Sequence, residues 1–274
     1  LGSTEDGITT TLGRSGSDYS ASIVGAALGC DEIWIWTDVD GVMTADPRYV
    51  KGAISLTEIS YREAAEMSYF GAKVIHPKTM VPAIERNIPI RIKNTFNPSH
   101  PGTLISAAPQ ANSRLVKNVT SINDLGLVAV EGSGMVGVPG IAARIFTALA
   151  RARVNVMMIS QASSEHNVCL VLPLNDCRKA VQELRNEFAP EIGKKFVDNV
   201  KLKEGVSIVA VVGDGMRGVP GIAARTFTAV ADAGVNVIAI AQGSSELNIS
   251  IVVEQADIQK TVQAVHDVFT MNRC

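Results

Sequence analysis

A glycine-containing turn near the amino terminus carries residue types that suit anion binding. It reads Gly13-Arg14-Ser15-Gly16-Ser17-Asp18, with a short strand predicted over Thr9–Leu12 and a helix over Tyr19–Leu28. Backbone N–H groups at the start of a helix attract an anion, and an arginine can clamp a carboxylate or phosphate. The plainer alternative is a tight strand-to-helix turn capped by Ser17 or Asp18. A Walker loop is excluded because GxxxxGK(S/T) is absent.

A second polar cluster follows a strand predicted to be buried, Asp31–Trp36. Thr37–Val42 and Asp46–Arg48 come directly after it. Open α/β sheets bind ligands beyond the carboxyl ends of their strands, so this cluster is a candidate ligand site. A solvated acidic turn is the alternative. An EF-hand is excluded, because Gly41 comes too early and Tyr49 stands where the loop needs Glu.

Three further elements are predicted to position these turns. They are a helix over Tyr61–Phe70 capped by Ser60, a helix near Thr79–Arg86 and a strand over Pro89–Lys93. Between the helices lies a segment with one histidine, His76. The four histidines are dispersed, so we expect no metal site built by the protein.

The rest of the chain is duplicated. Gly134 and Gly215, and likewise Glu165 and Glu246, are 81 residues apart, and a Val-Pro-Gly-Ile-Ala-Ala-Arg run lies at the same spacing. Such a period fits a small domain rather than a solenoid repeat.

Each copy shows the same order of predicted elements: strand, helix, strand, strand, helix. The hydrophobic spacing places them as follows: strands at Val128–Val130, Val154–Ile159 and His166–Leu172 with a helix at Asp176–Phe188, and strands at Ile208–Val212, Val235–Ile240 and Leu247–Val253 with a helix at Asp257–Phe269. Pro139 and Pro220 suit the first turn of the remaining helix in each copy.

This pattern resembles the ACT domain, a ferredoxin-like βαββαβ module that binds small amino acids. The first copy has a candidate fourth strand at Phe196–Leu202, whereas the second copy has none after it. An unpaired sheet edge is a liability. We therefore expect Leu115–Ile122 to complete the second sheet, so that the first domain is inserted within the second.

Composition favours a protein of two or three globular domains. The 274 residues are 46% hydrophobic with a net charge of −2, which argues against nucleic acid as a partner. No apolar run is long enough to span a membrane, and no signal peptide is recognisable. The four cysteines are scattered, and we expect reduced, mostly buried thiols in a cytoplasmic protein.

Together the amino-terminal motifs closely resemble aspartate kinase, and the paired ACT domains match its regulatory half. The resemblance runs from Thr9 to Phe269 and rests on five stretches in the order that family shows: Thr11–Asp18, Trp36–Gly41, Asp46–Arg48, Phe70–Pro77 and Ile92–Thr95. It implies ATP-dependent phosphorylation of the L-aspartate side chain. It also implies an α/β fold: part of an amino-acid-kinase three-layer sandwich followed by two ferredoxin-like ACT domains.

The resemblance also implies roles for particular residues. Aspartate would be held by Arg14, Ser15, Gly16, Ser17 and Asp18, with Arg14 and Asp18 taking part in catalysis. The family usually has glycine where Ser15 stands. ATP, accompanied by Mg²⁺, would contact Thr37, Asp38, Met43, Arg48, Lys73 and Val74.

An effector amino acid would bind at the strand-to-helix turn of the ACT domains. The residues expected there are Met135, Gly137, Val138, Gly140, Ile141, Asn155, Val156, Gln161, Asn236 and Gln242. A sharp helix entry at Val-Pro-Gly and a plain turn at Asn155 are the structural alternative. Gln-x-Ser-Ser-Glu resembles threonine-responsive aspartate kinases more than lysine-responsive ones, so threonine is expected first and lysine second. A homodimer or larger assembly joined through the ACT domains is also implied.

One family feature does not occur. No Lys-Phe-Gly-Gly stretch is found, and its lysine is expected to contact the transferring phosphoryl group. We therefore expect a chain truncated at its amino terminus that lacks aspartate kinase activity by itself. The alternative function is an amino-acid-binding regulatory subunit without catalysis. Glutamate or carbamate kinases fit less well, because paired ACT domains point to aspartate.

These expectations divide the chain into domains. Residues 1–106 would form the carboxy-terminal part of the kinase domain and 107–114 a linker. The first ACT domain would span 123–204, and the second would combine 115–122 with 205–274.

Overall fold

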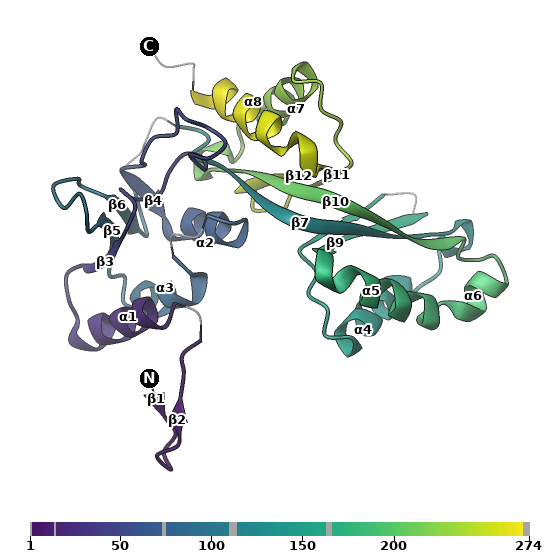
Figure 1. The fold of residues 1–274 in the computed structure, drawn as a ribbon, viewed down its shortest axis with the longest axis horizontal. Helices are drawn as coiled ribbons and strands as arrows, with labels where there is room; N and C mark the ends of the chain where they lie inside the picture. Colours follow the sequence, from purple (N-terminus) through teal and green to yellow (C-terminus); the bar gives the residue numbers. More distant parts are fainter. Residues whose placement is uncertain (1, 14, 73–74, 110–113, 163–165, 271–274) are drawn as a thin grey trace.

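The computed structural model describes residues 2–13, 15–72, 75–109, 114–162 and 166–270. It contains a four-stranded sheet in the first third and a six-stranded sheet in the remainder. Figure 1 shows the first sheet at the left and a long ribbon formed by β7 and β10 that extends to the right. Helices lie above the left end of this ribbon and below its right end. The α/β class expected from the sequence is confirmed.

The first sheet has the strand order β3-β5-β6-β4. Strands β3 and β5 run parallel, so their carboxyl ends lie at the same edge. Strands β4 and β6 are also parallel, whereas β5 and β6 are antiparallel. The bounds are β3 (Ile33–Thr37), β4 (Glu58–Ser60), β5 (Ile90–Asn94) and β6 (Thr103–Ser106).

Helices α1 (Gly16–Leu28), α2 (Tyr61–Tyr69) and α3 (Pro77–Glu85) pack against this sheet. Every second residue of the strands is buried toward them, as the period of a strand requires. The shared core includes Ile33, Ile35, Ile59, Ile90, Ile92, Ile105, Ala64, Met67, Met80 and Ala83. A capping box between Ser60 and Glu63 starts α2.

The other face of the first sheet corrects one prediction. The segment Asp31–Trp36 was expected to be a buried strand, but Trp34 and Trp36 are 52% and 45% exposed. Their rings flank Lys93, whose Nζ lies 5.3 and 5.5 Å from the ring centroids. Apolar composition cannot separate a strand covered on one face from a strand covered on both.

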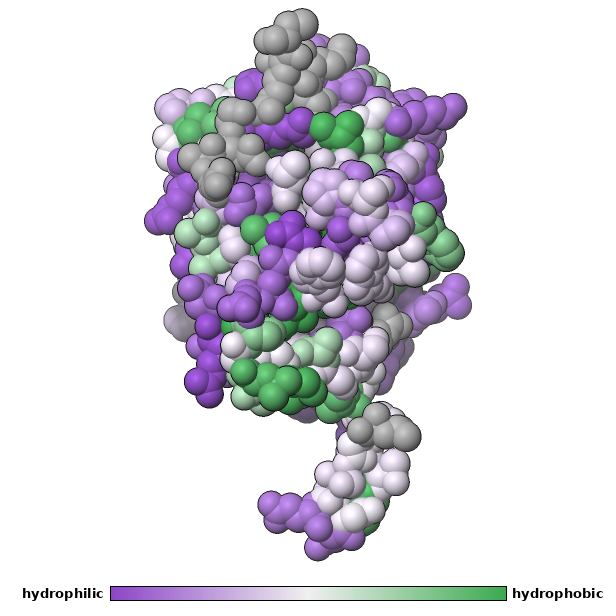
Figure 2. Space-filling model, turned by 90° about the vertical axis from the view of Figure 1, so that its left-hand side faces the viewer, coloured by the Kyte–Doolittle hydropathy of each residue, from purple (hydrophilic) through white to green (hydrophobic). Residues whose placement is uncertain are grey.

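The amino-terminal strand lies apart from the first sheet. Only Thr9–Thr10 of the predicted Thr9–Leu12 strand is extended, and this strand (β2) pairs with Gly2–Ser3 (β1). Figure 2 shows this hairpin projecting below the body of the molecule, and apolar side chains gathered toward the lower end of the same face.

The second sheet has the order β11-β12-β10-β7-β9-β8. Its neighbouring strands are all antiparallel. The bounds are β7 (Asn118–Glu131), β8 (Met158–Gln161), β9 (Asn167–Pro173), β10 (Asn199–Val212), β11 (Ala239–Ala241) and β12 (Asn248–Glu254).

Strands β7 and β10 each serve both repeats. The first half of β7, Asn118–Ile122, pairs with Ile208–Val212 of the second repeat. Its second half, Leu125–Glu131, lies between β9 and the first half of β10. The segment expected to complete the second sheet therefore pairs with the second repeat. The changeover falls where Asp124 and Gly205 have positive φ values of 57° and 72° and the pairing register shifts.

Each repeat has two long helices and its own core, and the first repeat adds the short α6. The elements are α4 (Ile141–Arg151), α5 (Leu174–Glu187) and α6 (Ala189–Gly193) in the first repeat, α7 (Ile222–Asp232) and α8 (Ile258–Thr270) in the second, and the short 3₁₀ helices η1 (Ser133–Met135), η2 (Asp214–Met216) and η3 (Gln255–Asp257).

An arginine clamp is duplicated with the fold. The Arg144 guanidinium lies 4.5 Å from the Phe188 ring centroid, and Arg225 lies 4.5 Å from that of Phe269. Each arginine also donates to a backbone carbonyl near the end of the facing helix, at Glu187 and Val268. The repeats therefore share contacts as well as topology.

The second strand of each repeat starts later than predicted. It was expected from Val154 and Val235, but pairing begins at Met158 and Ala239. Arg153 and Gly234 have positive φ and end the preceding helices, and the next residues serve as connections. Within the described ranges, no helix combines the length and apolar composition needed to cross a membrane.

Candidate active site

The polar clusters after β3 and β5 lie at the same edge of the first sheet. Thr37 is the last residue of β3, and its carbonyl accepts from the Thr95 N–H at 2.8 Å. Asp38 is exposed and accepts from the Thr37 hydroxyl at 3.2 Å. Two residues predicted to contact ATP therefore lie side by side at a carboxyl edge, where ligands of α/β sheets bind.

The loop after β3 then crosses to the second sheet. Met43 forms an antiparallel bridge with Ser55, and its carbonyl accepts from Asn118 Nδ2 at 2.8 Å. The Val119 N–H donates to the Thr44 carbonyl at 2.9 Å, and Ala45 and Val119 form a parallel bridge. Part of the predicted ATP loop thus covers the edge of β7, a strand of the repeats.

Arg48 lies farther along this loop. Its side chain is 84% exposed and makes a two-pronged ion pair with Asp46, with N–O distances of 2.6 to 3.1 Å. The guanidinium holds the pKa of Asp46 below its usual value. Because the arginine remains exposed, a phosphate can approach it.

The predicted aspartate turn is described only in part. Ser15 adopts a left-handed conformation, φ 55° and ψ 36°, immediately before α1 and makes no side-chain cap. Glycine adopts this conformation without strain, which explains why glycine suits the position. Gly16 begins α1, and Asp18 in its first turn accepts from the Ser17 hydroxyl at 3.3 Å.

Arg14, Lys73 and Val74 lie outside the described residues. The predicted roles of Arg14 in aspartate binding and of Lys73 and Val74 in ATP binding are therefore not tested. The neighbouring Gly71 is described and packs tightly: a Cβ there would lie 2.5 Å from the Ser121 carbonyl oxygen of β7. The segment that leads to Lys73 thus also touches the second sheet.

The predicted effector residues of the first repeat surround the start of α4. Met135 is buried in η1, Gly137 and Gly140 have φ of 68° and 93°, and Val138 is 47% exposed. Ile141 opens α4, which has no side-chain cap. Asn155 and Gln161 are exposed, Val156 is partly buried, and the equivalents Asn236 and Gln242 are exposed.

The turn of the second repeat is held by carboxylates. The Asp214 N–H donates to Glu63 Oε1 of α2 at 2.8 Å, and the Gly218 N–H donates to Glu246 Oε2 at 2.7 Å. Glu63 is fully buried and pairs with Lys117 at 3.3 Å. Helix α2, which packs on the first sheet, therefore contacts the turn of the second repeat, and the ACT resemblance places an effector at such turns.

Sequence reasoning missed these contacts. Glu63 showed only its capping-box spacing, and Lys117 and His266 showed no pattern at all. His266 is 4% exposed, and its Nε2 lies 2.9 Å from Thr44 Oγ1 of the ATP loop. Burial lowers the pKa of His266. Contacts between residues so distant along the chain leave no periodic signal.

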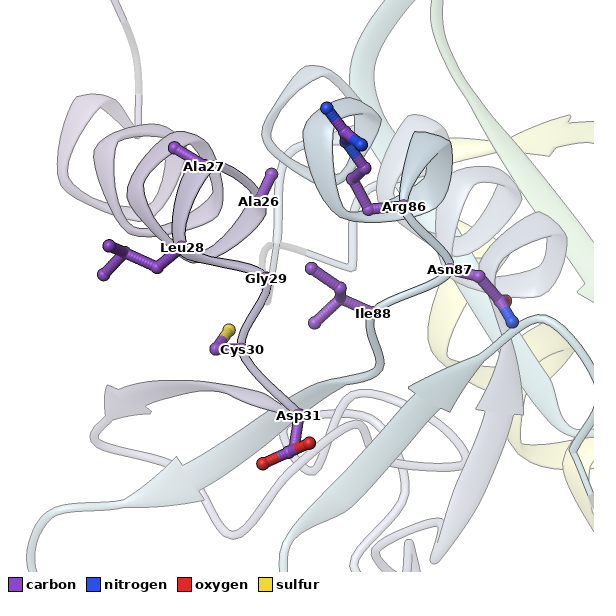
Figure 3. Close-up of a pocket in the computed structure, with 9 residues that line it drawn as sticks. All are labelled: Ala26, Ala27, Leu28, Gly29, Cys30, Asp31, Arg86, Asn87 and Ile88. Carbon is purple, nitrogen blue, oxygen red and sulfur yellow. The ribbon is translucent and has the colours of Figure 1, made fainter.

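One pocket lies elsewhere. It measures about 490 Å³ and is formed where α1 and α3 end, at the edge of the first sheet opposite Thr37. Figure 3 shows Ala26, Cys30 and Ile88 around it, with Asp31 pointing away below. Of the predicted site residues that the structure describes, none lines it.

The described residues suit part of a nucleotide site. An exposed arginine such as Arg48 and backbone N–H groups are able to bind phosphate, and a carboxylate such as Asp38 is able to bind a ribose hydroxyl or a water of Mg²⁺. Within the described ranges, no three His, Cys, Asp or Glu side chains converge as metal ligands.

Comparisons with known proteins agree on a family. The model of the amino acid kinase family matches residues 1–94, and the ACT domain model matches residues 128–188 and 209–269. The chain is 46% identical over 269 residues to the bifunctional aspartokinase/homoserine dehydrogenase of Haemophilus influenzae, covering 98% of this chain and 33% of that protein. It thus spans about a third of the length of that relative.

Solved structures give the same result. The crystal structure of Clostridium acetobutylicum aspartate kinase matches with a TM-score of 0.87 at 32% identity, over 98% of this chain and 61% of that one. E. coli aspartokinase III in complex with aspartate and ADP matches with a TM-score of 0.79 at 32% identity, over 97% of this chain and 58% of that one. The same enzyme with lysine and aspartate gives 0.76 at 33% identity, over 98% and 58%.

Proposed function

We infer the function of this chain from the family models that match it, the amino acid kinase family at residues 1–94 and the ACT domain at residues 128–188 and 209–269. Its relatives are aspartate kinases, alone or fused to homoserine dehydrogenase. We propose that it is part of an aspartate kinase that phosphorylates the L-aspartate side chain with ATP and is inhibited by an end-product amino acid. The observation that carries this proposal is the loop Met43–Arg48, which joins the predicted ATP site to the repeats.

Phosphoryl transfer needs positioning and charge neutralisation more than covalent help from the protein. In the proposed mechanism Arg14 clamps a substrate carboxylate, and the turn Ser15–Asp18 orients the aspartate at the start of α1. Thr37, Asp38, Met43 and Val74 hold the nucleotide, and Arg48 and Lys73 face its phosphates. Magnesium bound with ATP would neutralise charge on the phosphate oxygens.

Feedback requires two states of the protein that differ in affinity for both ligands. The path between the sites is short, because Thr44 contacts both β7 and His266 of α8. Glu63 contacts the turn of the second repeat from α2. An effector that shifts the Thr44 contacts would change the ATP loop directly, whereas one that shifts the Glu63 contact would act on α2.

We propose that the effector binds at the turn Met135–Ile141 with Asn155, Val156 and Gln161, and at Asn236 and Gln242 in the second repeat. Helix amides suit its carboxylate, and the amide side chains suit an ammonium or hydroxyl group. Threonine is our first candidate, on the Gln-x-Ser-Ser-Glu resemblance. Lysine is the second, and it is present in the E. coli aspartokinase III complex.

The domain division and assembly are part of the proposal. The shared strands support residues 123–204 as an inserted ACT domain and 115–122 with 205–274 as the domain that receives it. We propose a dimer joined through the ACT domains. We do not expect residues 1–274 by themselves to catalyse phosphorylation of aspartate, because no Lys-Phe-Gly-Gly stretch, and so no lysine from it, occurs among them.

Calorimetric titration of residues 1–274 with Mg²⁺·ATP, threonine and lysine tests the function. We expect ATP to bind, and threonine to weaken ATP binding by the same factor by which ATP weakens threonine binding, as linkage requires. Arg48→Ala should weaken ATP binding, whereas the control Lys51→Ala, an exposed cation on the same loop, should not. Effector binding without any ATP binding would instead support the regulatory subunit.

A further inference from the structure

We propose that Asp40 is a positioning residue of the nucleotide site, fixing the loop after β5 against the loop after β3. This inference rests on the proposed kinase function. Asp40 does not belong to the residues assigned to ATP or aspartate above. It follows Asp38 by two residues, but the two carboxylates have different surroundings.

The Asp40 carboxylate joins two loops through side chains. Its Oδ1 accepts from Asn94 Nδ2 at 2.8 Å and from Asn97 Nδ2 at 3.1 Å. Asn94 ends β5 and is 9% exposed, and its own Oδ1 accepts from the Phe96 N–H at 2.9 Å. The carboxylate therefore fixes a turn whose backbone is already tied to Asn94.

Backbone contacts hold Asp40 itself in place. The Ser55 hydroxyl donates to the Asp40 carbonyl at 2.8 Å. The next residue, Gly41, has φ 121°, and a Cβ there would lie 2.3 Å from Thr103 Oγ1. The same Thr103 hydroxyl accepts from the Val42 N–H at 2.8 Å. The loop is thus anchored to β6 on one side of the carboxylate.

The two amide donors favour an ionised side chain. The Asn94 amide, followed by that of Asn97, holds the pKa of Asp40 below its ordinary value. Hydrogen bonds to a charged acceptor are roughly twice as strong as neutral ones. Asp40 can therefore hold both loops at neutral pH despite being partly exposed.

The consequence concerns Thr37 and Asp38. The Thr37 carbonyl already accepts from the Thr95 N–H, so the two loops meet there as well as at Asp40. If the Asp40 contacts are lost, Thr37–Asp38 can shift relative to the turn 94–97. A shift of about 1 Å in positioning groups can cost on the order of a hundredfold in rate.

The test compares Asp40→Ala, Asp40→Asn and Asn97→Ala in residues 1–274. Calorimetry measures binding of Mg²⁺·ATP and of threonine, and urea unfolding monitors the fold. We expect Asp40→Ala to weaken ATP binding about tenfold and Asp40→Asn about threefold or less, because an asparagine oxygen still accepts both bonds. Asn97→Ala, which removes one bond, should fall between wild type and Asp40→Ala. Asp31→Ala, an exposed carboxylate at the opposite edge of the sheet, is the matched control.

The outcomes are distinguishable. Wild-type ATP affinity in Asp40→Ala would overturn the role of Asp40, as would equal loss in Asp40→Asn and Asp40→Ala. If Asp40→Ala does not fold, Asn97→Ala and Asp40→Asn decide the question by the same comparison. Absence of ATP binding in the wild-type chain would overturn the proposed kinase function and this inference with it.

Discussion

Thr44 Oγ1 and His266 Nε2 lie 2.9 Å apart, although 222 residues separate them in the chain. Thr44 is on the predicted ATP loop, and His266 is on the last helix of the second repeat. Asp267 on the same helix lies 3.7 Å from His266 Nδ1, and Arg114 also influences this histidine. Thr44 and His266 are both buried, so their contact joins the two parts of the molecule inside the protein.

This buried histidine predicts a pH dependence of stability. Burial lowers the pKa of His266 in the folded state, so the unfolded chain takes up the proton first as pH falls. Stability should therefore decrease as pH falls through the unfolded value near 6.5 toward the lower folded value. Urea unfolding from pH 8 to pH 5 measures this loss, and His266→Gln, which can keep a bond to Thr44, should reduce it. An identical pH dependence in both proteins would contradict the prediction.

The buried pair of Glu63 and Lys117 predicts a large loss of stability on neutralisation. Glu63→Gln leaves the Lys117 cation without its carboxylate, which should cost about 3 kcal/mol or more in the free energy of unfolding. Urea unfolding at pH 7 is the measurement, with Glu85→Gln at the exposed end of α3 as the control. Adding Lys117→Met to Glu63→Gln should recover part of the loss. A loss below about 1 kcal/mol would show that water reaches the pair.

Substitution of Gly71 provides a steric test of the contact between the two sheets. A Cβ there would lie 2.5 Å from the Ser121 carbonyl oxygen, and φ is 107°. Gly71→Ala should therefore destabilise the protein by about 2 kcal/mol or more, because backbone must move. Gly52→Ala, where a Cβ meets nothing within 4 Å, is the matched control in thermal unfolding. Equal effects of the two changes would argue against a rigid contact at Gly71.

Ser15 predicts a stabilising change. Its left-handed conformation carries no compensating side-chain hydrogen bond. Ser15→Gly should raise the stability of the turn by about 0.5–1 kcal/mol, whereas Ser15→Ala should not. Hydrogen exchange of the first α1 amides reports on this turn directly. Slower exchange in both variants would mean that loss of the hydroxyl, not relief of strain, is responsible.

Several features of this fold could be predicted from the sequence, because motifs repeat along it or apolar and polar residues alternate. The spacing of 81 residues predicted the duplication, and the count of strands predicted that Leu115–Ile122 pairs with the second repeat, which Asn118–Ile122 does. The exposure of Trp34 could not be predicted, since a strand covered on one face can be as apolar as a strand covered on both. The fusion of Phe196–Leu202 and Ile208–Val212 into one strand, β10, was missed because Gly205 reads as a break.

The predicted site residues divide in a similar way. Thr37 and Asp38 follow a strand and could be proposed from that position alone. Asp40, Glu63 and His266 act through partners 54 to 222 residues distant, and only the folded chain brings these partners together. A single sequence contains no signal for such pairs.

Strands β7 and β10 pass through both repeats, so neither repeat has a complete set of strands of its own. Removing one repeat would remove part of an inner strand from the sheet of the other repeat, and thermal melting should show both repeats unfolding as one cooperative unit. Recombination that exchanges a single sensor between related chains would have to cut inside both strands, so the pair is expected to be inherited together.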